Sequence, residues 1–170
     1  MTCRVPPAAA FLFLLCFSHS AFAEAGRLRL GQMELAYDAH RWRAEASALS
    51  DVTLRPIGEL ARELDPVRLN AVPVEGPADC EGHARDALTG EIYEGAHATA
   101  VAVAGVDAVR LSAWTRCRNA MPHAVAICVA HEGLGYLFVV RQHSCQGGGN
   151  NLFSGIDPLA ELLEGVRFVP

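Results

Sequence analysis

Apolar and polar residues alternate along most of this chain, and that period of two constrains its fold more than any other feature. Between residues 124 and 130, for example, Val125, Ile127 and Val129 alternate with smaller side chains. Such alternation is typical of a strand with one buried face. The same pattern recurs over residues 32–37, 41–48, 52–58, 67–74, 99–104 and 109–116. Residues 136–140 are almost continuously apolar, as in a central strand, so the sequence predicts a sheet of many strands.

A middle segment carries helix signals instead. Residues 80–88 repeat apolar side chains at helical spacing. Asp79 precedes them, and its carboxylate can accept the free amides of a first turn, so Asp79 is expected to be the N-cap. Gly90 is expected to end this helix.

A second helix is predicted near the end of the chain. Asp157 is its expected N-cap, Pro158 occupies the first helical position, and Gly165 ends it. Residues 166–169 then form a terminal extension, and residues 24–30 are interpreted as a short polar lead. The predicted fold class is α+β, in which a mostly antiparallel sheet carries a middle helix and a C-terminal helix and is stapled by disulfides.

Residues 1–23 have the pattern of a secretory signal peptide. Arg4 gives a positive start, and residues 8–17 form an apolar run too short to span a bilayer as a helix. Ala21 and Ala23 then place small residues before a cut after Ala23. The alternative interpretation is a retained membrane anchor.

Cleavage would leave a single α+β domain, residues 24–170. Removal of Arg4 would change the formal net charge from −5 to −6, which argues against nucleic acid as a partner. All 14 basic residues are arginine, so a Schiff-base lysine and a Walker-type lysine are excluded. An all-arginine basic set is typical of a GC-rich bacterial genome, so we expect the mature protein in the periplasm, without a membrane contact.

Four cysteines would remain after cleavage, and their even number in an exported chain predicts two disulfides: Cys80, Cys117, Cys128 and Cys145. Four cysteines can form two disulfides in three different ways. A hairpin turn centred just after Pro122 would place Cys117 opposite Cys128 at a separation that a disulfide accepts. Cys117–Cys128 is therefore the favoured pair, and Cys80–Cys145 is the remainder.

Residues 35–42 read Leu-Ala-Tyr-Asp-Ala-His-Arg-Trp, an aromatic residue, a turn and a tryptophan in succession. This segment resembles the start of the PsbP/DcrB-like group of exported domains. The paired strands over residues 101–140 are similar too, as is the closing helix that runs into Val166, Arg167 and Phe168. The resemblance implies an α+β fold and brings no catalytic motif with it.

Six histidines would survive cleavage without forming a recognised metal motif: His40, His83, His97, His123, His131 and His143. The shortest spacings are His143 with Cys145 and Met121 with His123. The sequence contains no CxxC, CxxCH or HExxH, so we expect no metal and no cofactor. A protein that binds a metal or small ligand through His and Cys side chains is the alternative function.

Motifs of catalysis are missing as well. Gly-x-Ser-x-Gly does not occur, and Ser154 follows a predicted loop rather than the strand-to-helix elbow that exposes a nucleophile. Residues 147–151, Gly-Gly-Gly-Asn-Asn, could cradle an anion with backbone amides but lack both common phosphate-loop patterns. They are interpreted as a connector. We therefore assign no catalytic residue and do not expect an enzyme, a hydrolase being a distant alternative.

One predicted strand is rich in arginine: Arg110, Trp114, Arg116 and Arg118 share a face in the extended pattern. Guanidinium forks beside an aromatic ring could bind a carboxylate, an acidic partner or an anionic glycan. The alternative is a solvated face whose tryptophan is covered by a helix. The sequence thus predicts a noncatalytic periplasmic accessory or binding protein, whose partner is a periplasmic protein or an anionic ligand.

Overall fold

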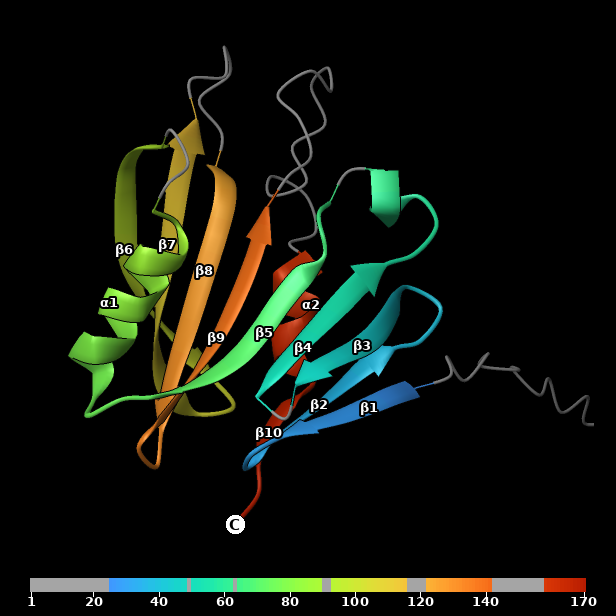
Figure 1. Ribbon diagram of the computed structural model, residues 1–170, viewed down its shortest axis with the longest axis horizontal. Coiled ribbons are helices and arrows are strands. Elements are labelled where there is room, and N and C mark those ends of the chain that lie inside the picture. The colour runs from blue at the N-terminus through green and yellow to red at the C-terminus, as the bar shows by residue number, and fades with distance from the viewer. Residues whose placement is uncertain (1–24, 49, 63, 90–92, 116–121, 142–157) are drawn as a thin grey trace, which may run out of the picture.

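A seven-stranded antiparallel sheet and a three-stranded sheet form the framework of the computed structural model of the chain (Figure 1). The structure describes residues 25–48, 50–62, 64–89, 93–115, 122–141 and 158–170. Two α-helices lie within these ranges, α1 (Pro77–Ala87) and α2 (Pro158–Glu164). The predicted α+β class, with a middle and a C-terminal helix, is confirmed.

The large sheet has the strand order β3-β4-β5-β9-β8-β7-β6, and every neighbouring pair is antiparallel. Most neighbours follow one another in sequence, but β5 pairs with the distant β9, where Leu69 lies opposite Phe138. A short 3-10 helix, η1 (Leu60–Arg62), connects β4 to β5. The strands are β3 (Trp42–Ala48), β4 (Asp51–Pro56), β5 (Val67–Pro73), β6 (Tyr93–Val103), β7 (Val106–Thr115), β8 (Pro122–His131) and β9 (Leu134–Arg141).

The small sheet has the order β1-β2-β10 and consists of β1 (Ala25–Leu30), β2 (Met33–Asp38) and β10 (Val166–Phe168). The interpretation of residues 24–30 as a polar lead is wrong, because β1 pairs with β2 along its whole length. Leu28 and Leu30 alternate there with the exposed Arg27 and Arg29. Apolar and polar residues alternate with a period of two in this segment, and the charges of Arg27 and Arg29 lie on the exposed face of the strand.

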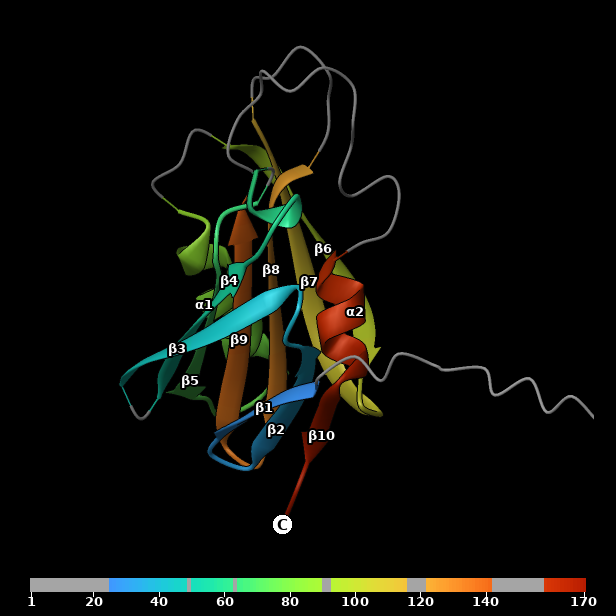
Figure 2. The ribbon, with the colours of Figure 1, turned by 90° about the vertical axis from the view of Figure 1, so that its right-hand side faces the viewer.

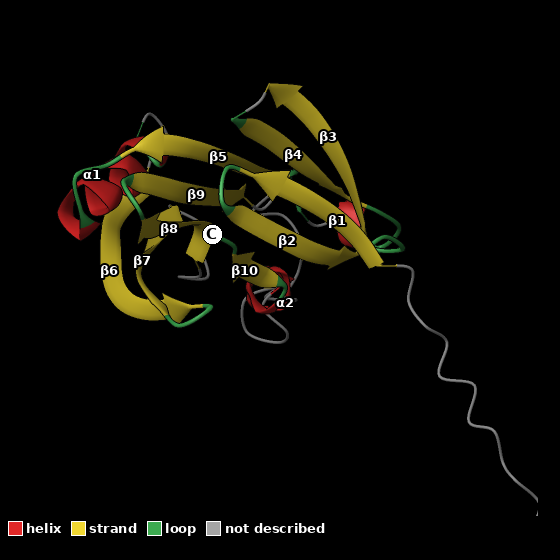
Figure 3. Ribbon diagram, turned by 90° about the horizontal axis from the view of Figure 1, so that it is seen from below, coloured by secondary structure: helices red, strands yellow, loops and turns green. Residues whose placement is uncertain are grey.

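The two faces of the large sheet are buried in two separate hydrophobic cores. In β8, Val125, Ile127 and Val129 face a large core shared with the small sheet and α2. Ala126 and Cys128 face a smaller core under α1. Figure 2 shows α2 beside the small sheet, and Figure 3 shows the large sheet curving around both, with α1 on its outer side. Small side chains on the α1 face of β8 allow the helix to pack closely.

Helix α1 begins three residues before the predicted position. Gly76 is its N-cap and Pro77 stands in its first turn, where the missing amide is not needed. The prediction that Asp79 is the N-cap is therefore wrong. Its carboxylate instead accepts a hydrogen bond from the backbone N–H of Glu75 at 2.9 Å, which fixes the chain entering the helix. The predicted end at Gly90 and the N-cap predicted at Asp157 for the second helix lie outside the described residues.

A disulfide joins α1 to the large sheet through Cys80 and Cys128, whose Cα atoms are 5.5 Å apart. Both predicted pairs, Cys117–Cys128 and Cys80–Cys145, are therefore wrong. The cause is strand register: β7 places Val109, not Cys117, opposite Cys128, and both face α1. Cys128 thus meets the helix packed over the sheet rather than a neighbouring strand. Cys117 and Cys145 lie outside the described residues.

Removal of this disulfide is expected to lower the free energy of unfolding by about 4 kcal/mol, because it links residues 48 positions apart in sequence. Denaturant unfolding of the double variant Cys80→Ala, Cys128→Ala against the oxidised parent measures the loss. Peptide mapping without reduction checks the connectivity, and a peptide linking Cys117 to Cys128 would contradict it.

Gly165 joins α2 to β10 at a close approach to β2. Its carbonyl accepts the backbone N–H of Ala36 at 3.0 Å, and an added Cβ would lie 1.9 Å from the Ala36 carbonyl oxygen. Gly165→Ala is therefore expected to lower the free energy of unfolding by about 2 kcal/mol or more. Gly82→Ala is the control, because a Cβ in that helical position meets no atom within 4 Å. It should raise stability by about 0.5 kcal/mol, and equal effects in denaturant titrations would refute the steric argument.

Candidate functional site

The predicted arginine-rich strand face is only partly described. Arg110 lies in β7 opposite Thr99 and Ile127, and it is half-buried. Its neighbour Leu111 faces α1, so Arg110 is on the opposite face of the sheet, toward the large core. The backbone of Trp114 belongs to β7, but its side chain, Arg116 and Arg118 lie outside the described residues. The binding prediction for this group stays a prediction.

A different group of arginines converges on the outer face of the sheet, the face that carries α1. Neighbouring residues of a strand point to opposite faces. Leu54 in β4 and Leu69 in β5 are buried in the large core, so Arg55, which follows Leu54, and Arg68, which precedes Leu69, point to the outer face. Arg141 ends β9 one residue after the buried Val140. Helix α1 packs on β7, β8 and β9 and leaves this part of the face uncovered by helix within the described chain.

Strand register brings these side chains together. Thr53 in β4 lies opposite Arg68 in β5, and Arg68 lies opposite Val139 in β9. The carbonyl of Arg141 accepts the backbone N–H of Asp65 at 2.9 Å, which holds the start of β5 against the end of β9. The result is an open cleft of about 490 Å³, hereafter the arginine cleft, lined by Thr53, Arg55, Asp65, Pro66, Arg68 and Arg141.

The three guanidiniums of the arginine cleft are held differently. Arg55 donates to the carboxylate of Glu45 at 2.6 Å, an ion pair with both side chains about half exposed. Arg141 donates to the Ala87 carbonyl at 3.0 Å and so ties the end of α1 to β9. The Arg68 side chain is exposed and makes no hydrogen bond or ion pair with any residue in the described ranges. Arg68 is therefore the group most available to an incoming anion.

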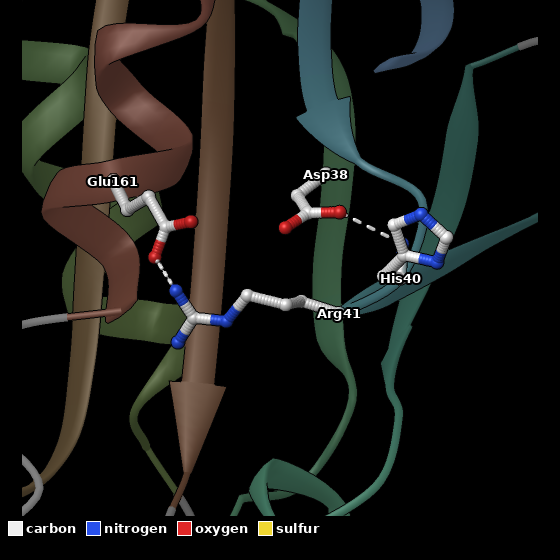
Figure 4. A network of polar contacts seen from close by, with 4 residues as sticks. All are labelled: Asp38, His40, Arg41 and Glu161. Atoms are coloured by element: carbon white, nitrogen blue, oxygen red, sulfur yellow. Dashed lines mark hydrogen bonds and ion pairs between the residues drawn. The ribbon is translucent and has the colours of Figure 1, made fainter. Parts of the chain in front are cut away.

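A second polar cluster lies where the turn between β2 and β3 meets α2. Figure 4 shows the Arg41 guanidinium reaching Glu161 on α2, and the two form an ion pair. The Asp38 carboxylate accepts the backbone N–H of His40 at 2.8 Å. The Arg41 and Glu161 side chains are 39% and 34% exposed, so solvent screens the pair. This cluster fixes a turn and a helix rather than building a site.

Histidine and cysteine do not assemble into a metal centre among the described residues, which contain no group of three or more His, Cys, Asp and Glu side chains at ligand distance. Cys80 and Cys128 are joined to each other and cannot act as thiolate ligands. The His131 ring lies against Phe168, with ring centroids 4.3 Å apart. His143, Cys145 and Met121 lie outside the described residues, as does the predicted loop at residues 147–151.

Comparison with known proteins identifies the fold. No protein-family model matches the chain, and no curated protein matches it in sequence. The solution structure of cyanobacterial PsbP (CyanoP) from Synechocystis sp. PCC 6803 superimposes with a TM-score of 0.55 at 15% identity. The match covers 88% of this chain and 95% of that one. The chain has a PsbP-like fold. The predicted resemblance to the PsbP/DcrB-like group is confirmed at the level of the fold.

Within the described ranges, the structure contains no helix long and apolar enough to cross a membrane.

Sequence reasoning did not find the arginine cleft. Each strand carried a signal, because Arg55 and Arg68 alternate with buried aliphatic residues. Pattern alone cannot place Arg68 beside the end of β9, since that depends on the pairing of β5 with a strand far along the chain. The sequence pattern favoured Arg110, Trp114, Arg116 and Arg118 because these residues are close together along the chain, and their binding role stays a prediction.

Proposed function

We propose that the protein is a noncatalytic exported binding protein that holds an anionic group in the arginine cleft. The supporting observation is the convergence of Arg55, Arg68 and Arg141 around one cleft in a chain whose formal net charge is −5. Among the described residues, three guanidiniums and the carboxylate of Asp65 line it, and Glu45 pairs with Arg55 beside it. Three positive and two negative charges leave this group positive, opposite to the whole chain.

The arginine side chain is well suited to binding an anionic group. Its planar guanidinium donates two parallel hydrogen bonds to a carboxylate or phosphate, and such charge-assisted bonds are stronger than neutral ones. The Thr53 hydroxyl adds a further donor at the same wall. The cleft is open and polar, which fits an anionic group on a small ligand or on the surface of a periplasmic partner.

The lining offers binding chemistry rather than a reaction. Within the part of the chain that the structure describes, neither histidine nor cysteine lines the cleft, and Thr53 supplies its one hydroxyl. An activated nucleophile needs an adjacent base, and among the described lining residues Asp65 is the one carboxylate. We therefore assign no catalytic step to this site.

The cleft is tested with three probes: inorganic phosphate, citrate and a hexaglutamate peptide, titrated into the full mature chain by calorimetry. At least one should bind, more weakly as salt rises. Arg68→Ala should weaken binding about tenfold, as expected for loss of one hydrogen bond to a charged group. Arg167→Ala is the control, because Arg167 is also exposed but lies on β10 of the small sheet.

Two outcomes would contradict the proposed site. One is failure of all three probes to bind, and the other is equal affinity in the Arg68→Ala and parent chains. Both variants should unfold within about 0.5 kcal/mol of the parent, because exposed substitutions seldom affect stability. A loss of binding can then be assigned to the missing guanidinium.

The compartment belongs to the same proposal. We expect export to the periplasm with removal of residues 1–23, for the signal features given above. N-terminal sequencing of the protein recovered from periplasm should begin at Glu24. Recovery of an intact Met1 in the membrane fraction would instead indicate a retained anchor.

A further inference from the structure

Strand β6 is an edge of the large sheet, and only its second half lacks the usual protection, because Glu94 and a register irregularity between Glu94 and His97 belong to its first half. Among the described strands, β7 alone is hydrogen-bonded to it. Exposed edges invite pairing with other chains, and proteins commonly guard them with charged residues. The opposite edge, β3, carries Arg43 and Glu45. Residues 97–103 of β6 read His-Ala-Thr-Ala-Val-Ala-Val and contain no Lys, Arg, Asp, Glu or Pro.

A groove runs beside this edge, between β6 and the first turns of α1. Its volume is about 490 Å³, and it shares no lining residue with the arginine cleft. Ala98 and Ala100 form its β6 wall and are exposed. In register they lie opposite Leu111 and Val109, which face α1, so both alanines point to the groove side of the sheet. Side chains that end at Cβ leave this space open.

The groove has an acidic rim and an apolar floor. Glu81 from α1 and Asp107 from the start of β7 line it, and no described lining residue is basic. The Glu81 carboxylate accepts a hydrogen bond from Arg85 on the same helix at 2.6 Å in an ion pair open to solvent, so Asp107 is the stronger source of negative charge at the rim. The floor contains Cys128 and Ala130. The disulfide of Cys128 with Cys80 ties α1 to the sheet at this point, so the groove is fixed before any partner arrives.

We propose that this groove and the outer edge of β6 together bind an extended peptide segment of another protein. The segment adds to β6 as a further strand. Its backbone hydrogen bonds to β6 give affinity whatever its sequence, and its side chains in the groove give specificity. Its bulky apolar side chains, on alternate residues, lean over Ala98 and Ala100 into the groove. A Lys or Arg beside the apolar residues meets Glu81 and Asp107, which gives the site its preference for a basic segment.

The same observations disfavour a second copy of this chain as the occupant. Pairing of β6 with β6 around a two-fold axis would set alanine against alanine and leave both grooves unfilled. It would also bring two acidic rims toward each other, and like charges oppose association. A heterologous segment with large side chains and positive charge satisfies both requirements.

A displayed library of random nonapeptides, selected on the oxidised full mature chain, tests this inference. Selected peptides should carry large apolar residues at alternate positions and at least one Lys or Arg. Their binding should shift the amide signals of residues 97–103 in NMR spectra and leave those of the arginine cleft unchanged. Absence of enrichment over a blank surface, or peptides lacking this pattern, would overturn the proposal.

Matched variants locate the binding. Ala100→Arg fills the groove and repels a basic segment, so affinity for selected peptides should fall at least about tenfold. Ala46→Arg is the control, since Ala46 is an exposed alanine on the opposite edge strand. Equal affinity of the parent and Ala100→Arg would refute the site.

A second variant keeps the test informative if Ala100→Arg unfolds the chain. Glu81→Gln with Asp107→Asn removes the acidic rim at partly or fully exposed positions and should weaken basic peptides several-fold, with a smaller effect at high salt. If this variant binds basic peptides as tightly as the parent does, the proposed preference for a basic segment is wrong. Sedimentation that shows a dimer broken by Ala100→Arg would identify a second copy as the occupant and overturn the inference.

Discussion

The backbone pairing of β5 with β9 holds the two halves of the large sheet together. It joins the hairpin strands β3 to β5 to the meander β6 to β9 and makes one sheet of them. Register there sets Leu69 opposite Phe138 within the large core. The same register turns Arg68 outward beside the end of β9, where Arg141 completes the arginine cleft. One nonlocal ladder thus determines both the core and the charge on the opposite face.

The outer face of this sheet is divided by α1 into two regions of opposite character. On one side is the arginine cleft, and on the other is the groove with Glu81 and Asp107 at its rim. The helix is held between them by the buried Cys80–Cys128 disulfide and by the hydrogen bond from Arg141 to the Ala87 carbonyl. Both proposed sites therefore depend on one short helix, and they differ in the sign of the charge they present.

Sequence patterns predicted elements well where the signal was local. The alternation in β2 to β5 and in β7 to β9 located those strands, and Pro158 with Gly165 bracketed α2. Errors arose where two segments had to be aligned. The turn assumed after Pro122 set the wrong register for β7 and β8, so Cys128 was given a strand partner instead of α1. The charges of Arg27 and Arg29 suggested a polar segment, although Leu28 and Leu30 alternate with them as in a regular strand.

Hydrophobic period and turn residues act over a few positions, so the linear pattern of residues is enough to specify a disulfide-stapled α+β domain. Which cysteines pair and which arginines share a cleft depend on how the strands align in three dimensions. Those outcomes depend on strand register, and a shift of one residue sends every side chain of a strand to the other face. Arg55, Arg68 and Arg141 become one site only after β4, β5 and β9 are aligned, and no local pattern encodes the contact of β5 with β9, which lies far along the chain.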